Sequence, residues 1–254
     1  MDILGELAAR ADRSGLFLDF DGTLSEIAPT PEAAVAAPGA AEVLSALARR
    51  FRVVAVVSGR RVEEVADKLE RPEDVQLFGL YGLEGGDHGD DGRAVESGAR
   101  AVEEILPRVL EVAAGVQGSL VEPKGSNLAV HYRLAPEPET AHRALLDALR
   151  PLARAVGLRV VEGKRVVELV PLDAPSKGDL LVRESRGLRG VLYAGDDLAD
   201  LDAFGALDAL AAAGAYAVKV AVRSAEAPDE LLRAAHLTVG GPSELVEVLR
   251  GLLE

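Results

Sequence analysis

The stretch that decides the fold reads Gly15-Leu16-Phe17-Leu18-Asp19-Phe20-Asp21-Gly22-Thr23-Leu24. The apolar run before Asp19 predicts a short buried strand. Residues two apart on an extended backbone point the same way, so Asp19 and Asp21 should leave the end of this strand together. The carboxyl ends of strands are where open α/β sheets bind their ligands. Gly22 allows the chain to turn sharply there, and Thr23 offers a hydroxyl group.

Short apolar runs and amphipathic helical patterns alternate on both sides of the middle of the chain. The strand-like runs are Gly15–Phe20, Arg52–Val57, Val75–Leu80, Gly190–Ala194 and Tyr216–Val222. The helical patterns are Ala40–Arg50, Val62–Leu69, Lys177–Arg186, Leu198–Leu207 and Ser243–Leu252. This alternation predicts an α/β core, a doubly wound parallel sheet covered by helices on both faces.

The middle of the chain has a different order of elements. A helix near 95–114 leads into strand-like runs at 119–122 and 127–133, and a second helix at 137–156 leads into runs at 158–162 and 166–170. An α-β-β-α-β-β order predicts an inserted α+β domain, an antiparallel sheet with two helices on one face. We therefore expect a core made of residues 1–103 and 174–254 and an inserted domain at 104–173. The Gly- and Asp-rich segment Gly85–Gly92 is expected to be a surface loop.

Composition narrows the classes of function. The 254 residues include 42 acidic and 28 basic side chains, which gives a formal net charge of −14. Such a chain repels nucleic acid and anionic membranes, so neither is expected as a partner. The chain has no cysteine, its N-terminus is acidic, and no apolar run approaches the roughly 18 residues that span a bilayer. We expect a cytoplasmic protein.

Three further groups of polar residues follow predicted strands or begin predicted helices. Ser58 ends the second strand, Lys177 begins a helix, and Asp196, Asp197 and Asp200 follow the strand that ends at Ala194. Each group has an ordinary structural alternative: a helix N-cap, a solvated helix residue, and acidic residues beside a helix dipole. Their joint occurrence at strand ends favours a site for phosphoryl transfer.

A close pair of carboxylates also implies a cation. Asp19 and Asp21 are costly side by side unless a cation lies between them or they share a proton. A hard cation with oxygen ligands meets this need, and magnesium beside a phosphate is the common case.

The whole set of core motifs resembles the haloacid dehalogenase superfamily of phosphatases. The residues that carry the resemblance are Asp19–Leu24, Ser58-Gly59-Arg60, Lys177-Gly178 and Gly195–Asp200. The resemblance implies a Rossmann-like core in which Asp19 attacks phosphorus and Asp21 is the general acid and base. Thr23, Ser58 and Lys177 would bind the phosphate. The implied metal residues are Asp19, Asp21, Asp196, Asp197 and Asp200.

Within that superfamily the chain is similar to the trehalose-6-phosphate phosphatases, from about residue 15 to 240. The similar segments are Ser25–Pro29, Tyr81–Glu84, Glu122–Ser126, His131–Arg133 and Gly163–Glu168. The last three resemble the part of that family's cap that grips the sugar. The resemblance implies that trehalose hydroxyls are bound by Glu122, Lys124, Arg133, Lys164 and Glu168. His131 and Tyr132 are given no catalytic role.

The resemblance has identifiable departures. The family commonly reads Gly-Asp-Asp-x-Thr-Asp-Glu in its last motif, and here Ala199 replaces the threonine and Leu201 the glutamate. Tyr81 stands where the family usually has histidine. The metal carboxylates are retained.

The expected function is magnesium-dependent hydrolysis of trehalose 6-phosphate through an aspartyl-phosphate. The partner is then a small sugar phosphate, with functional pairing to a trehalose-6-phosphate synthase. Two alternatives stay open. One is the same chemistry on sucrose 6-phosphate or a phosphoglycerate-linked sugar. The other is a non-catalytic sugar-phosphate sensor or a regulatory domain of a synthase, although such a domain usually loses Asp19 or Asp21.

Overall fold

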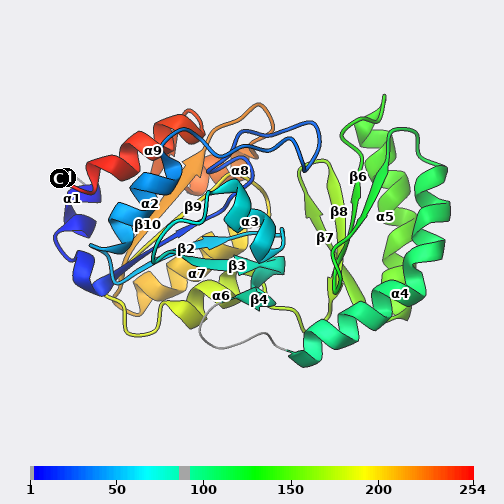
Figure 1. Cartoon of the computed structure of the whole chain (residues 1–254), viewed down its shortest axis with the longest axis horizontal. Coiled ribbons are helices and arrows are strands. Elements are labelled where there is room, and N and C mark those ends of the chain that lie inside the picture. Colours follow the sequence, from blue (N-terminus) through cyan, green and yellow to red (C-terminus); the bar gives the residue numbers. More distant parts are fainter. Residues whose placement is uncertain (1–2, 86–91) are drawn as a thin grey trace. The chain divides into compact units, whose positions relative to one another are not determined.

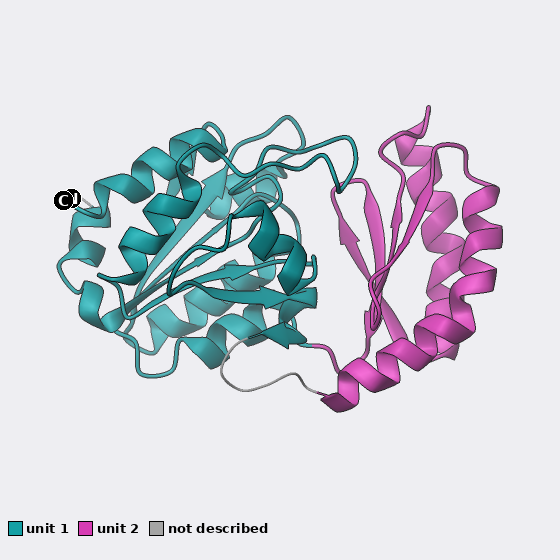
Figure 2. Ribbon diagram, in the orientation of Figure 1, with its two compact units in different colours: residues 1–87, 175–254 teal, residues 88–174 magenta. Residues whose placement is uncertain are grey.

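The computed structural model describes residues 3–85 and 92–254. The chain divides into two compact units, the first made of residues 1–87 and 175–254 and the second of residues 88–174 (Figure 2). Most of the expected loop Gly85–Gly92 lies outside the described residues. Among the described residues, no helix combines the length and apolarity that a membrane span requires.

The first unit contains a seven-stranded sheet in the order β11-β10-β9-β1-β2-β3-β4. All neighbouring pairs are parallel except β3 and β4. The strands are β1 (Ser14–Leu18), β2 (Val53–Val57), β3 (Gln76–Gly79), β4 (Glu84–Gly85), β9 (Gly190–Gly195), β10 (Tyr216–Val222) and β11 (Leu237–Val239). The five strands expected from the sequence are all present, and the structure adds the short strands β4 and β11. Elements of two or three residues are too short to show an apolar period.

Helices cover both faces of this sheet, as Figure 1 shows. One face packs against α1 (Ile3–Ala8), α2 (Ala40–Ala48), α3 (Val62–Lys68) and α9 (Pro242–Gly251). The other packs against α6 (Lys177–Glu184), α7 (Asp200–Ala212) and α8 (Asp229–Ala234). Side chains alternate between the two faces along β1, which explains the two layers. Leu16 and Leu18 pack in the core on the side of α1, α2, α3 and α9, and Phe17 packs in the core on the side of α6, α7 and α8. The expected doubly wound core is confirmed.

The second unit is a four-stranded antiparallel sheet in the order β5-β6-β8-β7, with two helices. Its elements are α4 (Gly92–Ala114), β5 (Leu120–Pro123), β6 (Leu128–His131), α5 (Pro138–Ala155), β7 (Leu158–Gly163) and β8 (Val166–Pro171). Leu128, Val130, Val167 and Leu169 pack with the apolar faces of α4 and α5 in one cluster. Helices therefore cover one face of the sheet, and the expected α+β architecture of the insert is confirmed.

The start of this unit differs from the expected domain boundary. Residue 104 lies inside helix α4, which begins at Gly92. A Cβ on Gly98 would lie 2.6 Å from both the Ser126 carbonyl oxygen and Pro171, so this first part of α4 is already in close contact with the second unit. Because α4 packs as one continuous helix, residues 92–103 belong with the second unit rather than with the core.

Candidate active site

Three polar side chains follow neighbouring strands at the same edge of the first unit's sheet. Asp19 follows β1, and its N–H donates to the Ala194 carbonyl at 2.9 Å. Ser58 follows β2, and its N–H donates to the Phe78 carbonyl at 2.9 Å. Asp196 follows β9. Because β9, β1 and β2 are adjacent and parallel, their carboxyl ends bring these residues to one edge, as the sequence motifs predicted.

A buried cluster of charges lies at this edge. Carboxylate oxygens of Asp19, Asp196 and Asp200 all lie within 4.8 Å of one another. The Lys177 ammonium lies 2.8 Å from Asp19 Oδ1 and 2.6 Å from Asp200 Oδ1. The side chains of Asp19, Lys177 and Asp200 are 7%, 5% and 0% exposed. One lysine thus faces two buried carboxylates, in a chain whose net charge is strongly negative.

The first turn of α6 holds Lys177 in place. Ser176 is the N-cap, and it exchanges hydrogen bonds with Asp179 in a capping box. The Gly178 N–H donates to Asp202 Oδ2 at 2.8 Å. A Cβ at position 178 would lie 2.7 Å from the same oxygen, so glycine allows the close approach of α7 to α6. The sequence gives no sign of the role of Asp202, because this role depends on the contact between the two helices.

Burial and the ion pairs shift the pKa values of this cluster in different directions. Burial raises the pKa of Asp19 well above its ordinary value, and Lys177 only partly opposes this effect. Burial would also raise the pKa of Asp200, but Lys177 and several hydrogen-bond donors lower it below its ordinary value. Burial lowers the pKa of Lys177, yet Asp19 and Asp200 together raise it well above the usual range. Lys177 therefore stays charged, and Asp200 is the more stable of the two carboxylate anions.

Asp200 is held by four donors. Its Oδ1 accepts from Lys177 at 2.6 Å and from the Tyr193 hydroxyl at 2.7 Å. Its Oδ2 accepts from the N–H groups of Asp196 at 2.8 Å and Asp197 at 2.9 Å. These bonds tie the turn after β9 to the start of α7 and to Lys177. The sequence gives no sign of this role for Tyr193, because a tyrosine in an apolar strand has the pattern of any other core residue.

Asp21 is paired with an arginine. The Arg60 Nε and Nη2 atoms donate to the two oxygens of Asp21, each at 2.7 Å. The Arg60 N–H also donates to Ser58 Oγ at 3.1 Å, so the turn after β2 aims the guanidinium at Asp21. The Arg60 side chain is 8% exposed and that of Asp21 is 46% exposed. The sequence motif Ser58-Gly59-Arg60 does not by itself indicate this role for Arg60.

Gly22 and Thr23 lie against the end of β9. The Thr23 hydroxyl is buried and lies 3.4 Å from Asp196 Oδ1. Gly22 has a φ angle of +80°, and a Cβ there would overlap the Asp196 carboxylate. Both the backbone conformation and the close approach of Asp196 therefore require glycine at this position.

The donor set of the cluster fits a hard divalent cation. Asp19, Asp196 and Asp200 offer only carboxylate oxygens, the ligands that such ions prefer. Asp200 already uses both oxygens in hydrogen bonds. Asp197 is half-buried, and its N–H donates to Asp200. Of the expected metal residues, Asp19, Asp196 and Asp200 thus lie together, and both oxygens of Asp200 are also engaged in hydrogen bonds.

The expected sugar-binding residues form two groups in the second unit. The Lys124 ammonium lies 2.7 Å from Glu168 Oε1 and 3.7 Å from Glu122 Oε2. The Arg133 guanidinium donates to the Lys164 carbonyl oxygen at 3.0 Å. The first group is a compact cluster of side chains, and the second links the end of β6 to the β7–β8 turn.

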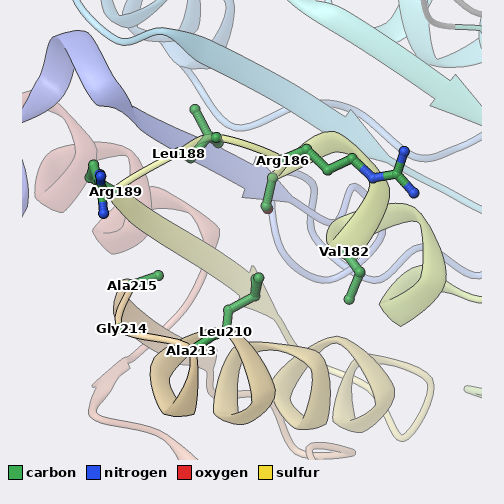
Figure 3. Close-up of a pocket in the computed structure, with 10 residues that line it drawn as sticks. Val182, Arg186, Leu188, Arg189, Leu210, Ala213, Gly214 and Ala215 are labelled. Carbon is green, nitrogen blue, oxygen red and sulfur yellow. The ribbon is translucent and has the colours of Figure 1, made fainter.

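A separate pocket lies at the other edge of the first unit's sheet. It has a volume of about 260 Å³ and is lined by the end of α6, the segment before β9 and the end of α7 (Figure 3). Its lining includes Val182, Leu188 and Leu210. Since β9 and β10 begin here, this edge is opposite to the carboxylate cluster. The pocket is therefore separate from the candidate site.

Comparison with known proteins agrees with this geometry. A sequence model described as "Trehalose-phosphatase" matches residues 17–234. The chain belongs to the trehalose-phosphatase family. Among curated relatives, a trehalose-phosphate phosphatase of Mycobacterium tuberculosis is 31% identical over 251 residues, covering 93% of this chain and 60% of the relative. A probable trehalose-phosphate phosphatase of Sinorhizobium fredii is 33% identical over 206 residues, covering 78% of this chain and 76% of the relative.

Some relatives of this trehalose-phosphatase family member are much longer. The chain is 39% identical over 207 residues to an uncharacterised glycosyl hydrolase of Mycobacterium tuberculosis, covering 77% of this chain but only 15% of that protein. A solved structure of the C-terminal domain of Candida albicans trehalose-6-phosphate phosphatase matches all of this chain and 97% of the domain, with a TM-score of 0.84 and 22% identity. That likeness shows the fold.

The departures from the trehalose-phosphatase pattern have a structural setting. Ala199 is the N-cap residue of α7, with a helical backbone and no side-chain cap. Leu201 is partly buried and packs against the apolar cluster beneath α6 and α7. The leucine therefore adds to the packing of the helix that carries Asp200.

Proposed function

We propose that the chain is a magnesium-dependent phosphatase that hydrolyses trehalose 6-phosphate to trehalose and phosphate. The observation that carries the proposal is the position of Asp19. Its carboxylate lies 2.8 Å from Lys177 and beside Asp196, at the carboxyl ends of parallel strands. Family membership supports the choice of trehalose 6-phosphate.

In the first step a carboxylate oxygen of Asp19 attacks phosphorus. The new bond joins this oxygen to phosphorus, and the bond between phosphorus and the sugar oxygen breaks. Asp21 gives its proton to the departing sugar oxygen. In the second step Asp21 takes a proton from water, whose oxygen attacks phosphorus and breaks the bond to Asp19. One carboxylate thus acts in both steps, and Asp19 is regenerated.

The phosphoryl oxygens need positive charge and hydrogen-bond donors. Lys177 supplies an ammonium that is held in place by Asp200, and Thr23 and Ser58 supply hydroxyl groups. All three side chains are at least nine-tenths buried, so little reorganisation is needed when the phosphate arrives. Preorganised donors of this kind are usually the main source of rate enhancement in phosphoryl transfer.

The magnesium ion would be held by Asp19, the main-chain carbonyl of Asp21, and Asp196. Asp197 or Asp200 would act through bound water. When bound, the ion neutralises the negative charge that Asp19 and the phosphate bring together.

A phosphate-release assay tests this function directly. Trehalose 6-phosphate should give the highest specificity constant in a panel that includes sucrose 6-phosphate and a phosphoglycerate-linked sugar. A chelator should abolish turnover, because Asp19 and Asp196 then repel the incoming phosphate, and added Mg²⁺ should restore it. Full activity in the chelator, or another sugar phosphate at the top of the panel, would refute the corresponding part of the proposal.

The sugar would be bound by residues of the second unit. Lysines and glutamates suit a neutral, hydroxyl-rich molecule, since one type donates hydrogen bonds and the other accepts them. The proposed residues are Glu122, Lys124, Arg133, Lys164 and Glu168. A trehalose-6-phosphate synthase is the proposed functional partner, because it would supply this substrate.

Truncation of the two glutamates tests the sugar-binding role. Glu122→Ala and Glu168→Ala should each raise KM for trehalose 6-phosphate by about 10- to 100-fold, because each removes a charged hydrogen-bond acceptor. Both variants should leave the hydrolysis of p-nitrophenyl phosphate unchanged, since this ester has no sugar. Equal losses on the two substrates would argue against sugar recognition.

The non-catalytic alternative has some support from fold alone. The C-terminal domain of a Candida albicans trehalose synthase regulatory protein matches 97% of this chain with a TM-score of 0.71 and 16% identity. The retained cluster of Asp19, Lys177 and Asp196 favours catalysis over a regulatory role. The phosphate-release assay decides between them.

A further inference from the structure

A row of polar side chains crosses the helix-free face of the second unit's sheet. Glu122 on β5, Ala129 on β6 and Glu168 on β8 are direct partners in the strand register. The neighbouring row of Val121, Val130 and Val167 points the other way and packs with α4 and α5. The two glutamates therefore share the opposite face, with the small Ala129 side chain between them.

The Lys124 ammonium lies close to both glutamates. Lys124 lies in the β5–β6 turn, where its N–H donates to the Asn127 carbonyl at 2.8 Å. Its ammonium is 2.7 Å from Glu168 Oε1 and 3.7 Å from Glu122 Oε2. Lys124 and Glu168 are only 6% and 4% exposed. Two carboxylates thus share one ammonium, so the row would repel an anionic group on the sugar of a ligand.

One oxygen of this row lacks a donor. Glu168 Oε2 is buried and has no hydrogen-bond partner among the described residues. Leaving a buried acceptor unpaired costs free energy, because the oxygen has lost its water without gaining a donor. A ligand hydroxyl that donates to this oxygen would remove that cost and could accept from Lys124 in turn. The chemistry of the row therefore matches the adjacent hydroxyls of a neutral sugar.

His131 contacts the Glu122 end of the row. It lies on β6 two residues after Ala129, so its side chain is on the same face. Its Nε2 atom is 2.7 Å from Glu122 Oε2. A carboxylate oxygen accepts, so the imidazole N–H donates. Glu122 Oε2 thus has the His131 imidazole at 2.7 Å and the Lys124 ammonium at 3.7 Å, and these two contacts restrict the direction of the carboxylate.

We propose that His131 is a positioning residue that sets sugar specificity by holding Glu122 in the row formed with Lys124 and Glu168. The Glu122 side chain is 21% exposed, so loss of the His131 contact would loosen its position in the row. The row would then lose one of its two fixed acceptors. This inference rests on the proposed function, because it assumes that the row binds the sugar of the substrate. It adds a residue that the family resemblance had left without a role.

Two substitutions separate the hydrogen bond from the bulk of the side chain. His131→Met keeps a similar size but removes the donor, whereas His131→Gln keeps an N–H at a similar reach. On trehalose 6-phosphate, the methionine variant should raise KM about tenfold with kcat within about twofold of wild type, since a hydrogen bond to a charged group is lost. The glutamine variant should stay within about threefold of the wild-type KM.

A second substrate keeps the test independent of folding. Both variants should hydrolyse p-nitrophenyl phosphate at the wild-type rate, which also shows that the core is intact. The inference is overturned if His131→Met leaves KM for trehalose 6-phosphate within about twofold of wild type. It is also overturned if the glutamine and methionine variants raise KM for trehalose 6-phosphate equally. The same holds if the methionine variant loses as much activity on p-nitrophenyl phosphate as on trehalose 6-phosphate.

The proposed substrate and the role of His131 are refuted by different results. If the wild-type protein does not hydrolyse trehalose 6-phosphate, the proposed substrate is wrong. The contrast between His131→Met and His131→Gln is then measured on the sugar phosphate that the wild type prefers. If the wild type hydrolyses trehalose 6-phosphate and the contrast is absent, only the role of His131 is wrong.

Discussion

Replacement of Asp19 by asparagine should lower kcat on trehalose 6-phosphate by at least about 10⁴-fold, because the amide cannot form the phosphorylated intermediate. The change is nearly isosteric, so the contacts of the main chain with Ala194 should persist. The loss should be as large on p-nitrophenyl phosphate, since both substrates need the nucleophile. Single-turnover reactions with radiolabelled substrate and an acid quench measure the intermediate: label should stay on the wild-type protein and be absent from the variant.

Asp21→Asn is the matched comparison for this experiment. It should reduce kcat/KM for trehalose 6-phosphate by about 10²–10⁴-fold, because the sugar oxygen leaves only when protonated. p-Nitrophenolate leaves without a proton, so kcat/KM for its phosphate should fall much less. Hydrolysis by Asp19→Asn at close to the wild-type rate would remove Asp19 from the nucleophile's role. Equal losses on both substrates in Asp21→Asn would remove Asp21 from the role of general acid.

Replacement of Lys177 by methionine should damage both activity and stability. Methionine has a similar length but no charge, so Asp19 and Asp200 lose the ammonium that lies within 2.8 Å and 2.6 Å of them. Removal of one partner from a buried ion pair costs about 3–5 kcal/mol of unfolding free energy. Loss of a preorganised donor to the phosphoryl oxygens should lower kcat/KM by about 10²–10³-fold. Urea unfolding and phosphate release measure the two effects.

Lys219 provides a matched control in the same unit. Like Lys177 it is a buried lysine, at 6% exposure, and it pairs with an aspartate, Asp208. The Asp208 side chain is 70% exposed, however, so it can be solvated when its partner is removed. Lys219→Met should therefore cost less stability than Lys177→Met and leave kcat/KM unchanged. Similar losses of activity in the two variants would show that any buried lysine matters equally, contrary to the proposed role of Lys177.

The residues at the ends of strands could be predicted because local pattern and topology are sufficient there. A buried apolar run followed by Asp19, Ser58 or Asp196 marks a strand end, and parallel neighbours bring such ends to one edge of the sheet. The α-β-β order of the insert likewise predicted its antiparallel sheet. Lys177 was placed at the start of a helix on the same basis. These inferences need only the periods of strands and helices and the rules of chain connection.

The partners of these residues could not be predicted in the same way. Tyr193 has the pattern of a core residue, and only the structure shows that its hydroxyl donates to Asp200. Arg60 lies 39 residues along the chain from Asp21, whose carboxylate it binds. His131 looks like an ordinary strand residue until the register sets it beside Glu122. Each of these contacts depends on which side chains the register and helix packing bring within about 3 Å, a distance that no local pattern specifies.

The sequence alone therefore determined the type of fold and the run Asp19-Phe20-Asp21 as its chemical centre, because apolar period and motif order are local properties. Only the tertiary structure decided how the charges are matched. It gave Asp19 its lysine, Asp21 its arginine and Asp200 its four donors. The physical reason is that burial makes the charges of Asp19, Asp200 and Arg60 costly, and this cost is offset by partners such as Lys177 and Asp21 that folding brings from other parts of the chain.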